Sequence, residues 1–268
     1  MSYILDDSTL LTADSEDEWQ AKTDQRFWNF DSAFGGWVGA LTVAAVNAHP
    51  AFRGRLITQN LQFHAAIKMD EIVLQVSLLE QRRRVDFWAV RVLTVDRAQV
   101  LASATLVFGE PEASELQYET SPRDVREPDQ SFRLPYNETT PTWFKHYEMR
   151  LAKGRPFQVN PTPSSTVWIR EADGRPLDGK ALAAIVDTPM PRSFFLTDQR
   201  IPASTVTLST HVYASDNTLA ACGNEFVQLD TDSLVVRDSL INQQSRLYSP
   251  NGLLLATSYQ TAMFRERR

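Results

Sequence analysis

The chain has 268 residues, of which 43% are hydrophobic and 22% charged, as in a globular protein with a large core. Its net charge of -6 argues against nucleic acid as the main partner, because nucleic-acid binding needs a basic face. The single cysteine, Cys222, excludes an internal disulfide and a thiolate metal cluster, and we expect it to be a small buried or half-buried side chain in a strand.

The N-terminal residues 1–19 contain neither a basic leader nor a long apolar run. We therefore expect no signal peptide, no membrane span and a cytoplasmic location. The four histidines are scattered without the paired spacing of metal ligands, so the sequence predicts no metal site, and we expect no cofactor.

The first part of the chain predicts one helix followed by four strands. Residues 35–50, "GGWVGALTVAAVNAHP", form an apolar helix that ends at Pro50. The strands alternate with short polar turns and cover 56–65, 71–81, 85–95 and 100–108. The helix is apolar nearly all round, which indicates that it is buried.

Residues 110–141 are rich in proline and charge, which indicates a linker with one short strand near 131–136. Beyond it the same order recurs: a helix over 177–191, then strands over 204–214, 218–230, 233–249 and 252–264. Asn251-Gly252 predicts a tight turn between the last two strands. We therefore expect an α+β protein with two domains, 1–112 and 142–268, joined by the linker 113–141.

Recurrence of the same elements indicates a duplication. Short windows align without gaps: 40–50 with 181–191, 58–64 with 205–211, and 101–106 with 255–260. In these windows Asp187 lies opposite Val46, Gln260 opposite Leu106, and Thr205 opposite Thr58. The second copy is the more polar one, as expected of a duplicated domain that keeps its chemistry in one copy.

Several segments in this order resemble the bacterial acyl-CoA thioesterase II type, a double hotdog protein. In the first half they are "FDSAFGGWVGA", "QNLQF", "EQRRRVDFWAVRV" and "LASATLVF". In the second half they are "WIREADGRPLD", "ALAAIVDTPMP", "ASTVTLSTHVY" and "LLATSYQTAMF". The resemblance covers roughly residues 25 to 266.

The resemblance implies a hotdog fold in each half, with a long buried helix wrapped by a curved antiparallel sheet. It also implies hydrolysis of a fatty or related acyl-CoA by a water that an Asp, Thr and Gln set activates. The matching residues are Asp187, Thr205 and Gln260. Independently of the family, Asp187 has a second interpretation as a helix-end turn residue before Thr188-Pro189.

Two further features are candidates for substrate binding. Gly35 and Gly36 begin the first helix, where free N–H groups suit an oxyanion, although such glycines also allow close packing. Trp37 is a candidate lining residue of an acyl tunnel, with a core position as the alternative. Arg82, Arg83 and Arg84 suit the phosphates of coenzyme A, although a charge run at a hairpin tip is more often a solvated turn.

Two rival functions remain at this stage. One is a non-catalytic protein that binds acyl-CoA or another acyl ligand. The other is a hotdog hydratase or dehydratase, which needs a histidine such as His211 beside the acid. Because hotdog sheets often associate, we also expect a homo-oligomer.

Overall fold

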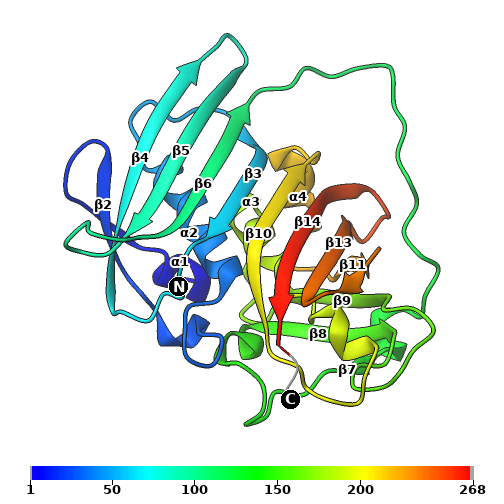
Figure 1. Ribbon diagram of the computed structural model, residues 1–268. Coiled ribbons are helices and arrows are strands. Elements are labelled where there is room, and N and C mark those ends of the chain that lie inside the picture. Colours follow the sequence, from blue (N-terminus) through cyan, green and yellow to red (C-terminus); the bar gives the residue numbers. More distant parts are fainter. Residues whose placement is uncertain (1, 266–268) are drawn as a thin grey trace.

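The computed structural model describes residues 2–265. Within this part, fourteen strands form one antiparallel sheet, and two central helices, α2 (Gly35–Asn47) and α3 (Gly179–Ile185), pack side by side against its inner face (Figure 1). The order across the sheet is β1-β2-β4-β5-β6-β3-β10-β14-β13-β11-β9-β8-β7, with β12 paired to β13. The expected α+β class, with a sheet around buried helices, is confirmed.

The first half (residues 2–112) contributes six strands and the N-terminal helix α1 (Ile4–Ser8). Its strands are β1 (Leu11–Ala13), β2 (Glu18–Lys22), β3 (Arg55–Phe63), β4 (Glu71–Gln81), β5 (Val85–Leu93) and β6 (Val100–Gly109). The four strands predicted from the sequence correspond to β3 to β6, whereas β1 and β2 were not predicted.

The linker contributes β7 (Phe132–Arg133), within the segment where a short strand was expected. The second half (residues 142–265) contributes the rest of the sheet and α4 (Asp216–Cys222). Its strands are β8 (Tyr147–Lys153), β9 (Ser165–Glu171), β10 (Ala203–Val212), β11 (Val227–Asp232), β12 (Val236–Arg237), β13 (Leu240–Tyr248) and β14 (Leu254–Phe264). The short 3-10 helices are η1 (Gln25–Phe27), η2 (Pro128–Gln130), η3 (Thr142–His146) and η4 (Arg192–Phe195).

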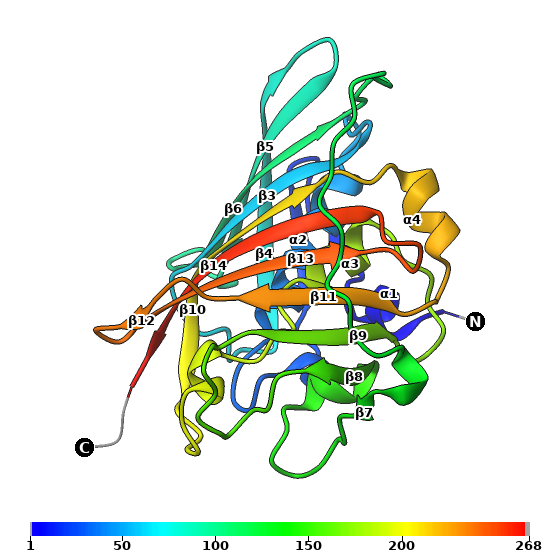
Figure 2. The same cartoon turned by 90° about the vertical axis from the view of Figure 1, so that its right-hand side faces the viewer.

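The two halves join edge to edge where β3 pairs with β10 in antiparallel register, Leu61 opposite Leu208. Figure 2 shows the strands of both halves running on as one twisted layer, with α2 and α3 on one side of it. A long antiparallel sheet with one covered face suits the alternation of buried and exposed residues along these strands.

The second-half elements differ from the prediction in several places. β8 and β9 were not predicted, and the single strand expected over 233–249 is divided into β12 and β13. Residues 218–230 were expected to be one strand, which is wrong: Ser215 accepts a hydrogen bond from the Thr218 N–H (3.1 Å), caps α4, and β11 begins only at Val227. Cys222 is buried as expected, but in this helix rather than in a strand. The central helix of this half has only seven residues and ends at Ile185.

The duplication extends to the irregularities of the strands. An extra residue interrupts the β5–β6 pairing at Leu101 and the β13–β14 pairing at the equivalent Leu255. A second bulge lies at Ile57 in β3 and at Val206 in β10. These registers place Leu56, rather than Thr58, at the position equivalent to Thr205, which corrects the ungapped alignment.

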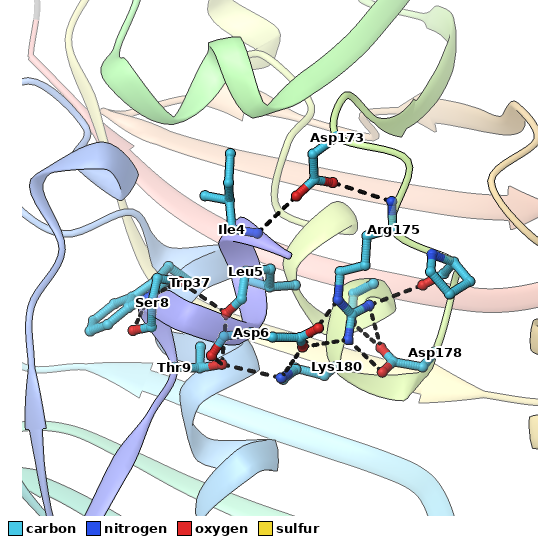
Figure 3. Close-up of polar contacts among 12 residues, drawn as sticks. Ile4, Leu5, Asp6, Ser8, Thr9, Trp37, Asp173, Arg175, Asp178 and Lys180 are labelled. Carbon is cyan, nitrogen blue, oxygen red and sulfur yellow. Dashed lines mark hydrogen bonds and ion pairs between the residues drawn. The ribbon is translucent and has the colours of Figure 1, made fainter. Parts of the chain in front are cut away.

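Helix α1 is bound to the start of α3 by ion pairs (Figure 3). The Asp6 carboxylate accepts from Arg175 (2.9 Å) and pairs with Lys180 (2.5 Å). Arg175 also bonds Asp178, the residue that caps α3 by accepting from the Ala181 N–H (2.7 Å). The first residues of the chain therefore position a helix that lies about 170 residues later in the sequence.

Candidate active site

Asp187 lies just after the C-terminal end of α3. The helix ends because Thr188 turns its hydroxyl back onto the carbonyl oxygen of Ile185 (2.7 Å), and Pro189 and Pro191 cannot continue a helical ladder. The Asp187 side chain points at the first turn of α2, where its Oδ2 atom would lie 2.6 Å from a Cβ on Gly35. The carboxylate therefore sits between the end of one central helix and the start of the other.

Gln260 forms hydrogen bonds with both of the other candidate catalytic residues, Asp187 and Thr205. Its side-chain Nε2 donates to Asp187 Oδ1 (2.7 Å) and to Thr205 Oγ1 (2.6 Å). The structure thus brings together Asp187 from the turn after α3, Thr205 from β10 and Gln260 from β14.

A β-bulge turns Thr205 toward this site. Leu208 and Thr210 face the buried side of β10, so regular alternation would point Thr205 to the outer face. The extra residue Val206 shifts the register, and Thr205 pairs with Ala262, which shares the inner face with Gln260. The bulge is therefore what places the hydroxyl beside the glutamine.

The surroundings of Asp187 favour its protonated form. Asp187 as a whole is half-buried, and burial of its carboxylate raises the pKa to about 7. The backbone N–H of Gly36 and the side-chain amide of Gln260 oppose this rise because both interact with the charged form. A carboxylate with a pKa near neutrality is suited to accept and return a proton.

The glycines at the start of α2 allow the close approach of the two helices. A Cβ on Gly36 would overlap the carbonyl oxygen of Ala184 in α3 and the ring of Phe34. The same closeness brings the Gly36 N–H to the Asp187 carboxylate. Close packing and an N–H group beside the acid are thus consequences of one contact.

Trp37 lies away from the carboxylate. Its indole is fully buried, and its Nε1 donates to the backbone oxygen and the hydroxyl of Ser8 in α1 (3.2 Å each) (Figure 3). Phe63, by contrast, reaches within 3.1 Å of a Cβ on Gly35, so it is the aromatic residue that borders the site.

The arginines 82–84 lie at the other end of α2. Arg53, which follows this helix, bonds Asp86 (2.7 Å) and the carbonyl oxygen of Arg82, whereas Asp187 contacts the helix start. Thirteen helical residues separate these ends by about 20 Å. Arg84 pairs with Glu112, and Arg82 stacks over Phe87 at the β4–β5 hairpin. The structure therefore does not bring the arginine run to Asp187.

His211 does not approach the acid. It lies in β10 between Thr210 and Val212, which are both buried on the inner face, so its side chain occupies the outer face. Among residues 2–265 no group of ligand-type side chains is arranged for a metal ion. Within the same residues, no helix combines the length and the apolar character that a membrane crossing requires.

Sequence reasoning missed two residues behind Gln260. Gln243 donates from Nε2 to Gln260 Oε1 (2.6 Å), and Arg192 donates from Nε to Gln243 Oε1 (3.0 Å). A signal for Gln243 was available, because it alternates with the apolar Ile241 and Leu247 along β13 and so lies on the buried face.

Comparison with known proteins gives matches to both halves. The sequence model of the acyl-CoA thioesterase N-terminal domain matches residues 24–109, and that of the acyl-CoA thioesterase C-terminal domain matches residues 118–264. No curated protein matches the chain in sequence.

Solved structures match over the whole length. A hot dog fold protein of unknown function from Alicyclobacillus acidocaldarius is 25% identical, covers 100% of both chains and has a TM-score of 0.94. A proposed thioesterase II from Thermobifida fusca is 15% identical over 98% of each chain (TM-score 0.84). An acyl-CoA thioesterase II from Mycobacterium marinum is 14% identical over 98% of each chain (TM-score 0.78). The fold of this chain is thus a double hotdog.

Proposed function

The chain belongs to the acyl-CoA thioesterase family, and from this premise we propose that it hydrolyses a fatty or related acyl-CoA to the free acid and coenzyme A. The observation that supports this most is the single amide of Gln260, which bonds both Asp187 and Thr205. Family membership indicates a thioester substrate, and the three side chains supply the means to activate a water.

In the proposed reaction Asp187 acts as the general base. A water held beside the carboxylate transfers a proton to it and adds to the thioester carbonyl carbon. The tetrahedral intermediate then breaks its C–S bond, and the proton on Asp187 passes to the departing sulfur. One water is consumed, and a carboxylic acid and a thiol are formed.

Thr205 and Gln260 position the components. The Thr205 oxygen accepts from Gln260, so its hydroxyl proton is free to donate to the water or to the substrate. The first turn of α2 has backbone N–H groups without helical partners, and we propose that this turn stabilises the oxyanion. The Gly36 N–H faces the Asp187 carboxylate, so the acid and the proposed oxyanion site lie at the same helix start.

Acyl-CoA hydrolysis is tested by thiol release. Purified protein is mixed with acyl-CoA of short to long chain, and free coenzyme A is followed with a thiol reagent. We expect turnover that falls about 1,000-fold in Asp187→Asn, because an amide cannot accept the proton.

The matched control is Asp198→Asn, which changes an exposed aspartate shortly after Asp187 and should leave turnover unchanged. Binding without turnover at every chain length would contradict the proposal and favour a non-catalytic acyl-ligand protein.

A further inference from the structure

Arg192 is a buried cation whose hydrogen-bond acceptors are neutral oxygens rather than carboxylates. It belongs to η4, is fully enclosed, and stacks its guanidinium 4.5 Å over the ring of Phe195. It donates to the carbonyl oxygens of Met190 (3.1 Å) and Pro163 (3.1 Å) and to the hydroxyl of Ser165 (2.8 Å). Its remaining contact is Gln243 Oε1. Burial lowers the pKa of Arg192 to about 9, so it keeps its charge at neutral pH.

In the hydrogen bond between Arg192 and Gln243, Arg192 can only be the donor and Gln243 only the acceptor. A guanidinium has only donors, so Gln243 must turn its oxygen toward Arg192 and its NH₂ group away. That NH₂ donates to Gln260 Oε1, which forces the NH₂ group of Gln260 toward Asp187 and Thr205. An amide alone has two nearly equivalent orientations, and the arginine selects one of them for both glutamines.

The first half shows what the same strand positions contain without this chemistry. Gln243 pairs with Gln260 across β13 and β14, and the equivalent pair across β5 and β6 is Trp88 and Leu106. Both are fully buried and apolar at their contact. On the inner face of the second half, Gln243 is therefore a third polar residue, beside Thr205 and Gln260, at a position where the first half is apolar.

We propose that Arg192 and Gln243 are positioning residues, which hold Gln260 with its amide nitrogen toward Asp187 and Thr205. This inference rests on the proposed function, in which those two groups handle the water. Gln260 Oε1 is turned toward Gln243 and Nε2 toward Asp187 and Thr205, so Gln260 acts on those two groups as a donor. The proton of the water must then go to Asp187, which is the one acceptor of the three that carries charge.

The decisive variant is Gln243→Glu. It has the same size and keeps an acceptor for Arg192, whose charge holds the new carboxylate ionised. A carboxylate cannot donate to Gln260, so Gln260 turns its NH₂ toward position 243 and its oxygen toward Asp187. We expect kcat to fall at least about ten-fold, with KM within about two-fold and without a loss of thermal stability.

Two further variants separate positioning from general support of Arg192. Ser165→Ala removes one acceptor of Arg192 but leaves the contacts with Gln243 intact, so kcat should stay within about two-fold. Arg192→Lys keeps a charged donor and should retain more activity than Arg192→Met. Unchanged kcat in a folded Gln243→Glu protein, or an equal loss in Ser165→Ala, would overturn the inference.

A second readout does not depend on turnover. The side-chain amide resonances of Gln260, assigned by their loss in Gln260→Leu, should follow the ionisation of Asp187 in the wild type and no longer do so in Gln243→Glu. If the wild type hydrolyses no acyl-CoA but shows this behaviour, the proposed function fails and the positioning role stands. If the resonances respond to pH alike in both proteins, the positioning role fails.

Discussion

The two halves of the molecule share their strands, their bulges and the place of their central helix, but they differ in the side chains on the inner face. Where the first half has Leu56 and Leu106, the second half has Thr205 and Gln260. The strand framework with its bulges is thus shared by a half that is apolar at these inward positions and a half that has a candidate active site there. A few inward positions are enough to distinguish the two.

The comparison also shows a division of labour. The first half has the longer central helix, buried along nearly its whole length, and its glycine-rich start approaches Asp187. The second half has a helix of seven residues that ends just before Asp187. The start of the central helix of the first half therefore borders the candidate site, whose three side chains belong to the second half.

Making the second half resemble the first should have the largest effect. Gln260→Leu copies the residue at the equivalent position 106 and removes the donor to both Asp187 and Thr205. We expect kcat to fall about 100-fold. The matched variant Leu106→Met keeps an apolar side chain of similar volume in the first half and should leave kcat unchanged. Equal losses in both would show that the halves contribute alike.

The two helix starts should respond differently to an added methyl group. Gly36→Ala would overlap the backbone of Ala184, and we expect a loss of about 2 kcal/mol in the free energy of unfolding. Gly179→Ala, at the start of α3, meets only Leu56 Cβ at 3.7 Å and should cost nothing measurable. Urea unfolding of the two variants measures the difference, and equal stabilities would contradict the close contact of the helices.

The pH profile should report the ionisation of Asp187, which has the apolar Val46 as its counterpart in the first half. The base works only when unprotonated, and burial raises the pKa of Asp187 to about 7. Activity at subsaturating substrate should therefore rise about ten-fold from pH 6 to pH 8 and then level off. The residual activity of Asp187→Asn should lack this rise; the same rise in that variant would assign it to another group.

The smallest effect concerns the two faces of β10. Thr205→Val keeps the shape of the side chain and removes the hydroxyl beside Gln260, so we expect about a five-fold fall in kcat. Thr207→Val makes the same change just past the bulge, on the outer face, and should leave kcat unchanged. A loss in Thr207→Val alone would mean that the bulge points the other way in solution.

Much of the fold was predictable because the apolar patterns are strong. The helix at 35–47 and the strands β3 to β6 follow from the apolar pattern alone. Helix α4 was missed because "TLAAC" is apolar enough for a strand, although Ser215 is a helix-capping residue.

The site was less predictable from pattern. The residue types of Asp187, Thr205 and Gln260 came from family resemblance, and strict alternation along β10 would have placed Thr205 on the wrong face. A bulge shifts register by one residue and leaves no clear mark in a single sequence. Arg192 was missed for a related reason, because only the fold reveals that a charged residue after two prolines is enclosed.

The binding of α1 to α3 by ion pairs has a consequence for biosynthesis. Asp6 leaves the ribosome well before its partners Arg175 and Lys180, which are made about 170 residues later. At translation rates of about 5–20 residues per second, on the order of ten seconds pass between the synthesis of α1 and the synthesis of Arg175 and Lys180. The first half can therefore collapse around α2 while α1 still lacks its ion-pair partners, whereas α3 finds α1 already made when it emerges.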